Sequence, residues 1–82
     1  MALSPERIEK RLKKVFLNVF PTIDPDHVTD ASTETVSTWD SLATLTLFTT
    51  AEAEFSITLG FDRIQNTKSF ADMNALVTRA LS

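Results

Sequence analysis

Asp40 and Ser41 are the residues of this sequence whose types and position suggest chemistry. They follow Trp39 in the stretch VSTWDSLATL and come just before an apolar run. A serine hydroxyl acts as a nucleophile when a base, a group that orients the base and an oxyanion site lie within hydrogen-bond reach. The only histidine is His27, in a polar segment, and no glycine pattern of a nucleophile elbow surrounds Ser41. We therefore expect no enzymatic activity and interpret His27 as a solvated loop residue.

A metal site is the second chemistry that the sequence raises. Asp24, Asp26 and Asp30 are spaced loosely like the acids of a calcium loop. Such a loop also needs a glycine at its sharp turn and a closing bidentate glutamate, and both are missing. The chain has no cysteine, which excludes disulfides and thiolate metal sites. We expect no metal ion, and any thiol has to come from an attached or bound group.

The length and composition indicate one small domain. The chain has 82 residues, which suffices for a single domain over residues 1–82 and is short for an elaborate enzyme cleft. Its N-terminal residues mix charged and apolar side chains, and no continuous apolar stretch reaches the length of a signal peptide or a membrane span. We expect a soluble, cytoplasmic monomer without a membrane partner. The starting Met1 and the compact ends favour a free-standing chain.

Charge is distributed unevenly along the chain. The net charge is −3, but residues 1–20 carry five basic and two acidic side chains, whereas residues 21–82 carry three basic and nine acidic ones. Nucleic-acid binding needs a basic surface that neutralises phosphates, and only residues 1–20 offer one. Because a charged outer helix face is usually just solvated, we expect no nucleic-acid partner. A helical nucleic-acid binder is kept as an alternative that salt-dependent DNA binding would support.

The first predicted helix covers residues 5–20. Ser4 supplies a capping hydroxyl and Pro5 suits the first helical position, whereas Pro21 ends the helix. Its apolar stripe consists of Ile8, Leu12, Val15, Phe16 and Val19. Residues 21–38 show no sustained period and predict a long loop. Such loops are uncommon in compact domains unless they are pinned, and we expect Ile23, Val28 and Val36 to be the pins.

The second predicted helix runs from about Ser41 to Glu54. Asp40, or alternatively Thr38, is expected to cap it, with a side-chain oxygen that accepts an amide hydrogen of the first turn. Its apolar stripe consists of Leu42, Leu45, Phe48, Ala51 and Phe55, widened by Leu47. We expect the threonines of this helix to be polar surface; they are Thr44, Thr46, Thr49 and Thr50.

The last part of the chain predicts a connector, a short helix and a longer one. Residues 56–59 alternate briefly, but a single short strand has no partner, so we interpret them as a connector. Residues 61–64 allow one helical turn. The final helix begins at Ser69, which forms a capping-box pattern with Asp72. Its predicted inner face consists of Phe70, Met73, Leu76, Val77 and Ala80.

Together these elements predict an all-α four-helix bundle with three longer helices, one short helix and a long loop between helices 1 and 2. The phenylalanines at helical spacing are expected in its core; they are Phe16, Phe48, Phe55 and Phe70. Trp39 lies in the loop, and we expect its indole to cover the entry to the second helix; the alternative is a contact with a ligand or partner.

Ser41 can also be a substrate instead of a catalyst. A residue in the first turn of a helix projects its hydroxyl outward, and the free amide groups and positive dipole end around it suit an attached phosphate. Asp40 could help a modifying enzyme to bind by presenting a carboxylate to its metal ion or to a basic side chain. A protein that is modified in this way needs no base, metal or deep cleft of its own.

The segment Asp40-Ser41-Leu42 at the start of a second helix resembles the phosphopantetheine attachment motif of acyl carrier proteins. With Trp39 it gives the WDSL variant found among discrete and biosynthetic-cluster carriers. The resemblance extends over nearly the whole chain, through the opening helix, the long loop, AEAEFSI at the end of the second helix, the short third helix and SFADMNALV in the last helix.

By this resemblance, Ser41 is expected to carry 4′-phosphopantetheine, a covalent group derived from coenzyme A whose thiol holds an acyl or aminoacyl group as a thioester. Asp40 is implied to be a recognition residue, and Leu42 a contact for partner enzymes. The implied partners are a phosphopantetheinyl transferase and the acyl-loading and acyl-using enzymes of a biosynthetic pathway. The absence of cysteine fits, since the thiol belongs to the cofactor.

The second helix departs from the family in its charge. Fatty-acid carriers often display several acids there for basic partner surfaces, whereas here only Glu52 and Glu54 are acidic. Weaker electrostatic steering favours a specialised pathway, and the basic first helix is a candidate second docking face. The alternative is a non-catalytic helical protein-interaction module in which Asp40-Ser41 is only a helix cap.

Overall fold

Three α-helices and two short 3-10 helices form the described part of the chain. The computed structural model describes residues 3–81, in which there is no strand. In chain order the elements are α1 (Pro5–Val19), η1 (Pro25–Asp30), α2 (Ser41–Phe55), η2 (Phe61–Asn66) and α3 (Phe70–Leu81). The prediction of a small all-α domain with three longer helices is confirmed. Met1, on which the expectation of a free-standing chain partly rested, lies outside the described residues.

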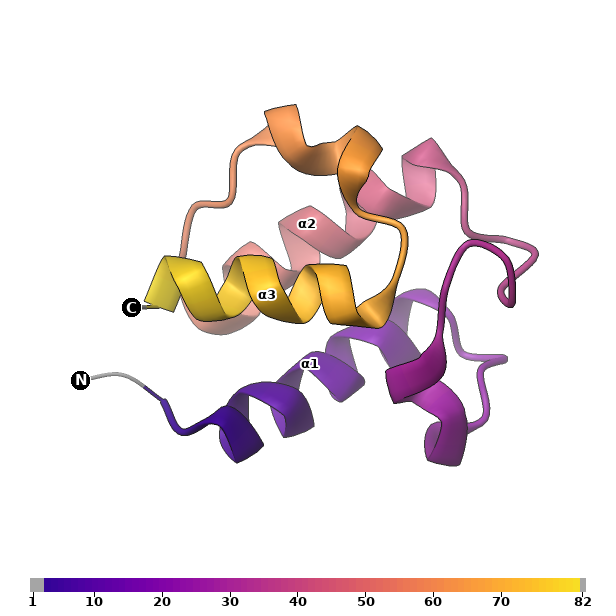
Figure 1. Ribbon diagram of the computed structural model, residues 1–82, viewed down its shortest axis with the longest axis horizontal. Helices are drawn as coiled ribbons and strands as arrows, with labels where there is room; N and C mark the ends of the chain where they lie inside the picture. The colour runs from indigo at the N-terminus through magenta and orange to yellow at the C-terminus, as the bar shows by residue number, and fades with distance from the viewer. Residues whose placement is uncertain (1–2, 82) are drawn as a thin grey trace.

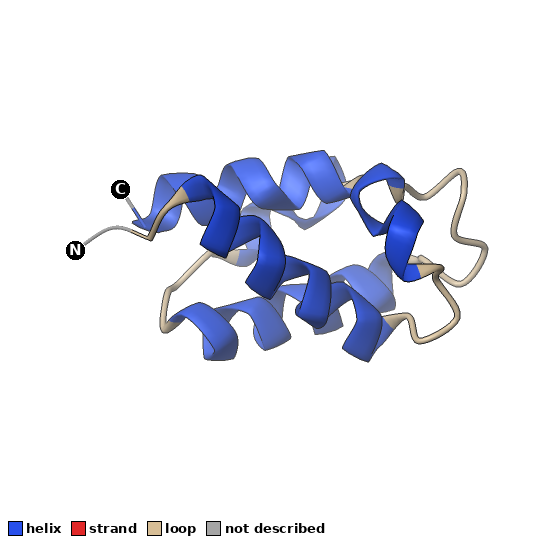
Figure 2. Ribbon diagram, turned by 90° about the horizontal axis from the view of Figure 1, so that it is seen from below, coloured by secondary structure: helices blue, strands red, loops and turns tan. Residues whose placement is uncertain are grey.

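α1 packs against both α2 and α3 and runs below the two of them in the view of Figure 1; Figure 2 shows it from its own side. The start of α1 and the end of α3 lie at one end of the molecule, whereas α2 begins at the opposite end, beside the loop that follows η1 (Figure 1). η2 packs on α2, and η1 packs on α1 and α3. The buried residues of these elements form one hydrophobic core, so the start of α2 stands at the end of a continuous packed body.

α1 has the predicted start and ends one residue before the predicted Phe20; its predicted stripe is buried except for Val19, which is half-buried. The Ser4 hydroxyl accepts a hydrogen bond from the Arg7 amide at 3.3 Å, and Pro5 is the first helical residue. The buried residues of the helix are Ile8, Leu12, Val15 and Phe16. Phe20 leaves the helical conformation before Pro21 and is itself buried. Local capping and proline geometry thus set both ends of α1.

The loop between α1 and α2 is more ordered than its sequence indicates. It contains η1, which the absence of an apolar period concealed because a 3-10 turn needs no amphipathic stripe. Val28 and Val36 are buried and Ile23 is half-buried, as expected of the pins. An isolated antiparallel bridge between Ser32 and Ser69 also ties the loop to the start of α3. In this bridge Thr33 N–H donates to the Lys68 carbonyl and Phe70 N–H donates to the Ala31 carbonyl, both at 2.9 Å.

The C-terminal helices lie where the sequence predicts them, but their capping, helix type and buried face differ from the prediction. The Ser69 hydroxyl accepts from the Asp72 amide at 3.1 Å, but the Asp72 carboxylate reaches back to the amide of Lys68 and not to that of Ser69. The predicted short helix is the 3-10 helix η2, which Gly60 precedes at a φ of 78°. Phe70, Met73 and Val77 are buried, whereas Leu76 is only half-buried and Ala80 is exposed, so the inner face is narrower than predicted.

The inward face of α2 differs from the predicted one. Phe48, Ala51 and Phe55 are buried as expected, together with Phe16 and Phe70 of the neighbouring helices. Leu42 and Leu45, however, are 71% and 37% exposed, whereas Leu47 is buried as predicted and Thr44, expected to be polar surface, is buried as well. The stripe prediction is wrong at Leu42 and Leu45 because apolar side chains point from α2 in several directions, so spacing alone does not choose the inward face.

Replacing Phe48 by Ala should lower the free energy of unfolding by about 3 to 5 kcal/mol, because the ring is fully buried and its removal leaves a cavity. Urea denaturation followed by circular dichroism measures the loss. Leu42→Ala is the matched control, since it truncates an exposed apolar residue of the same helix and should change the stability by about 0.5 kcal/mol or less. Equal losses in the two variants would contradict the assigned inward face.

Candidate functional site

Ser41 is the first residue of α2, and it is exposed. Asp40 caps the helix, as predicted: its carboxylate accepts from the Ala43 amide at 2.8 Å, and its carbonyl accepts from the Thr44 amide at 3.0 Å. Within the described residues, the amide groups of Ser41 and Leu42 have no hydrogen-bond acceptor. The Ser41 hydroxyl therefore stands beside two unpaired amides at the positive end of the helix dipole.

Trp39 holds the start of α2 in place from the buried side of the helix. Its side chain is 5% exposed, and its ring centroid lies 5.5 Å from that of Phe16 and 5.4 Å from that of Phe20. The indole N–H donates to the Thr44 hydroxyl oxygen at 2.8 Å, and this hydroxyl donates in turn to the Asp40 carbonyl at 3.0 Å. These consecutive hydrogen bonds form a buried polar chain from Trp39 through Thr44 to Asp40. Together with the packing of the indole on the two phenylalanines, the chain holds the loop before Ser41 and the first turn of α2 against the end of α1.

Thr44 is the residue of the candidate site that the sequence did not identify: we expected it on the polar surface, and it is buried. The sequence nevertheless contains a pattern that could have predicted its role. A buried indole needs an acceptor for its N–H, and a helical threonine four residues after the cap can return its own proton to the cap carbonyl. Trp39 and Thr44 have this spacing around Asp40.

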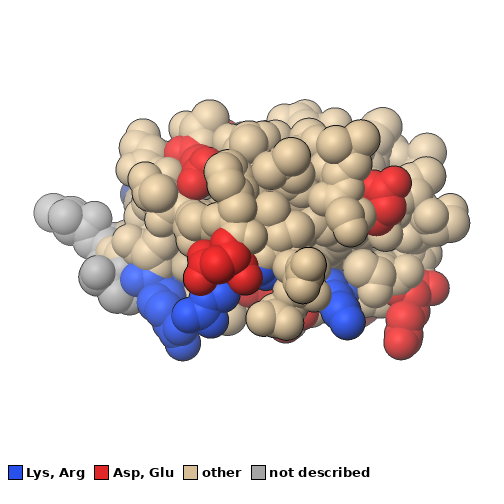
Figure 3. Space-filling view, turned by 90° about the horizontal axis from the view of Figure 1, so that it is seen from above, with Lys and Arg blue, Asp and Glu red and all other residues tan. Residues whose placement is uncertain are grey.

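α2 carries two acidic side chains, and both bind other parts of the molecule. Glu52 accepts from the Leu59 amide at 2.8 Å, and Glu54 forms an ion pair with Arg11 at 2.8 Å. The Arg11 guanidinium also donates to the Glu54 carbonyl and lies over the Phe55 ring. Both acids of α2 are therefore engaged within the molecule. Figure 3, which looks onto the side that carries η2, shows a mostly uncharged surface with charged side chains mainly toward one edge.

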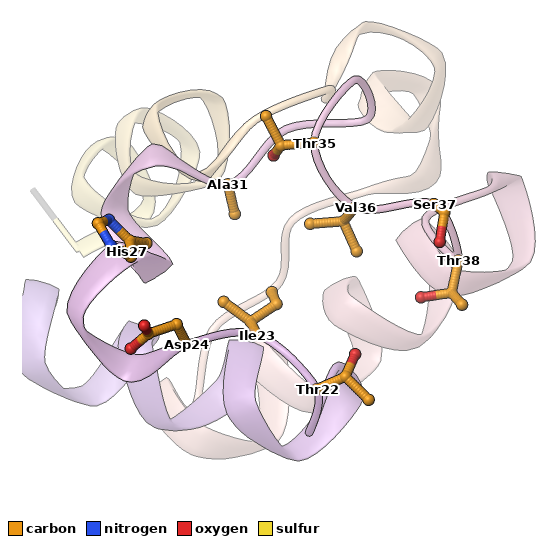
Figure 4. Close-up of a pocket in the computed structure, with 9 residues that line it drawn as sticks. All are labelled: Thr22, Ile23, Asp24, His27, Ala31, Thr35, Val36, Ser37 and Thr38. Atoms are coloured by element: carbon orange, nitrogen blue, oxygen red, sulfur yellow. The ribbon is translucent and has the colours of Figure 1, made fainter.

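His27 and Asp24 lie in a hollow of the loop that Ser41 does not line. His27, Asp24 and Thr38 line a hollow of about 270 Å³ to which α2 contributes no residue. Figure 4 shows Ile23, Ala31 and Val36 directed toward one another across this hollow, with His27 and Asp24 at one end and Ser37 and Thr38 at the other. The Asp24 carboxylate accepts from the Asp26 amide and so caps η1. The structure does not bring His27 and Ser41 together into one pocket.

Within residues 3–81, no group of three or more histidine, aspartate or glutamate side chains is arranged to hold a metal ion. None of the helices in the same range combines the length and the apolar character needed to cross a bilayer.

No protein-family model matches this chain, and comparisons with curated proteins and with solved structures find no significant similarity.

Replacing Thr44 by Val should lower the free energy of unfolding by about 1 to 3 kcal/mol, because the buried indole N–H of Trp39 loses its acceptor. Thermal or urea unfolding measures the change. Thr44→Ser keeps the hydroxyl and should retain most of this stability, whereas Thr49→Val removes an exposed hydroxyl of the same helix and should have little effect. If Thr44→Val and Thr49→Val were equally stable, the buried polar chain would not support the site.

Proposed function

We propose that this chain is an acyl carrier domain that is loaded at Ser41 with 4′-phosphopantetheine. The observation that carries the proposal is the exposed Ser41 hydroxyl at the first residue of a well-braced helix. A modifying enzyme needs access to this oxygen, and a carrier needs nothing catalytic beside it. The motif around Ser41 indicates which group is attached, and the exposure of Ser41 means that a modifying enzyme can reach it.

The residues around Ser41 fit this group. The unpaired amides of Ser41 and Leu42, at the positive end of α2, suit the oxygens of a phosphodiester. The Asp40 carboxylate is exposed yet held in place by the Ala43 amide, so a transferase can read it in a fixed position. When bound, the group supplies a thiol that holds an acyl or aminoacyl cargo as a thioester. The chain itself presents the Ser41 hydroxyl and orients the phosphate end of the attached group.

The proposed function also implies a specific fold, the four-helix bundle of acyl carrier proteins. In a four-helix bundle of acyl-carrier type, α1, α2 and α3 take the places of the three longer helices and η2 takes that of the short one. The implied partners are a phosphopantetheinyl transferase and the enzymes that load and use the cargo. Because Glu52 and Glu54 are engaged within the molecule, partner docking on α2 depends on uncharged contacts such as Leu42 and Leu45. This favours dedicated partners in a specialised pathway.

A helical interaction module is the second candidate, and one observation favours it. The Asp40 carboxylate already has a structural role as the cap of α2, so the motif has a sufficient reason to exist without a cofactor. The two candidates differ in whether Ser41 is chemically modified. Experiments on Ser41 and on Asp40 therefore separate them.

Incubating the protein with coenzyme A and a broad-specificity phosphopantetheinyl transferase should add one phosphopantetheinyl group, detected by intact mass. Ser41→Ala should abolish the adduct and leave the circular dichroism spectrum unchanged, since the side chain is exposed. Ser37→Ala removes another exposed serine near the start of α2 and should be loaded normally. An unmodified folded wild-type chain, or an adduct that persists in Ser41→Ala, would falsify the carrier assignment.

Replacing Asp40 by Asn separates recognition from capping. Asn caps helices about as well as Asp, so the free energy of unfolding should change by about 0.5 kcal/mol or less. Loading should nevertheless slow about tenfold or more, because a charge-assisted contact to the transferase is worth about 1.5 to 3 kcal/mol. Initial rates of adduct formation by mass spectrometry give the comparison. Equal rates for the variant and the wild type would leave Asp40 as a cap alone.

A further inference from the structure

A groove runs beside Ser41, between the C-terminal end of α1 and the part of α2 that reaches to Thr50. It encloses about 390 Å³, which is within the size range of small-ligand pockets. Asp40 and Leu42, the two neighbours of Ser41, line one end of it, and Thr50 lines it farther along α2. The rise from Asp40 to Thr50 is about 15 Å at the α-helical spacing. The groove thus starts at the proposed attachment point and follows the helix away from it.

The groove combines an apolar floor with an uncharged polar rim. The floor includes the buried Phe20 and the half-buried Val19 and Ala43. The rim includes Thr46 and Asn18, both exposed, which face the groove from the two helices. The Thr46 hydroxyl donates to the Leu42 carbonyl at 3.1 Å, which leaves its oxygen free to accept. These groups match a chain that alternates methylene groups with amides.

Charge sets which part of an attached group can enter. Asp40 is the one charged residue that lines the groove, and it stands at the end beside Ser41. A phosphodiester carries negative charge and is repelled by this carboxylate, whereas the neutral remainder of the arm is not. The hollow of Figure 4 is a poorer candidate, because it is lined by the loop between α1 and α2 and takes no residue from α2.

We propose that the neutral, amide-bearing part of the phosphopantetheine arm lies in this groove when no partner enzyme is engaged, with its phosphate outside. The inference rests on the proposed loading of Ser41. The Thr46 hydroxyl oxygen accepts a hydrogen bond from the arm, Thr50 and Asn18 can donate to it or accept from it, and Val19, Phe20 and Ala43 cover its methylene groups. The arm is held reversibly, and a partner enzyme withdraws it.

The test compares amide chemical shifts of the unloaded and loaded protein by NMR, after intact mass has established the adduct. Beyond the shifts next to Ser41, the loaded protein should show changes at Asn18, Thr46 and Thr50. Thr50→Phe fills the far end of the groove, so the changes at Asn18 and Thr46 should disappear. Thr49→Phe is the matched control, because Thr49 is an exposed neighbour that does not line the groove.

A second readout uses the absence of cysteine, since any thiol in the loaded protein belongs to the arm. Its alkylation should be faster in loaded Thr50→Phe than in loaded wild type, and unchanged in Thr49→Phe. If the adduct forms but shift changes stay within residues 39–44, the arm projects into solvent and the groove inference is overturned while the carrier proposal stands. If no adduct forms, both fall.

Discussion

The hydrogen bond from the Trp39 indole to the Thr44 hydroxyl connects the three parts of the molecule that meet at the start of α2. The indole packs on Phe16 of α1 and on Phe20 just after that helix, and its N–H donates to a side chain of α2. The Trp39 backbone belongs to the loop that η1 and the bridge to Ser69 hold in place. Since the buried N–H has this acceptor, the aromatic packing carries no unsatisfied polar group. Ser41 is therefore presented from a fixed base, although it is itself exposed.

Apart from the Asp40 carboxylate, the side chains that line the groove beside Ser41 are uncharged. The cap uses the Asp40 carboxylate, Glu52 binds the Leu59 amide, and Glu54 binds Arg11, so the acids of α2 act mainly within the molecule. Long-range attraction of a basic partner to this helix is correspondingly weak, and recognition depends on close contact with side chains such as Leu42. The same neutrality makes the groove beside α2 compatible with an uncharged arm.

The features that the sequence predicted well are local. Ser4, Asp40 and Ser69 each accept a hydrogen bond from an amide three residues ahead, so residue type and spacing were sufficient to place the helix starts. The inward face of α2, in contrast, is determined by contacts with residues outside the helix. Leu42, Leu45 and Leu47 point in different directions, and the side that is buried depends on Trp39 and α1, which periodicity does not include. The position of Ser41 was predictable for the first reason, and the role of Thr44 was missed for the second.

Because Trp39 is the only tryptophan, the intrinsic fluorescence of this protein arises from one indole two residues before Ser41. The ring is buried on two phenylalanines, and its N–H is bound to a hydroxyl that is itself bound to the helix cap. Any event that loosens the first turn of α2 must alter the polarity or the hydrogen bonding around this chromophore. The protein thus has a built-in optical probe of its helix tip that requires no label.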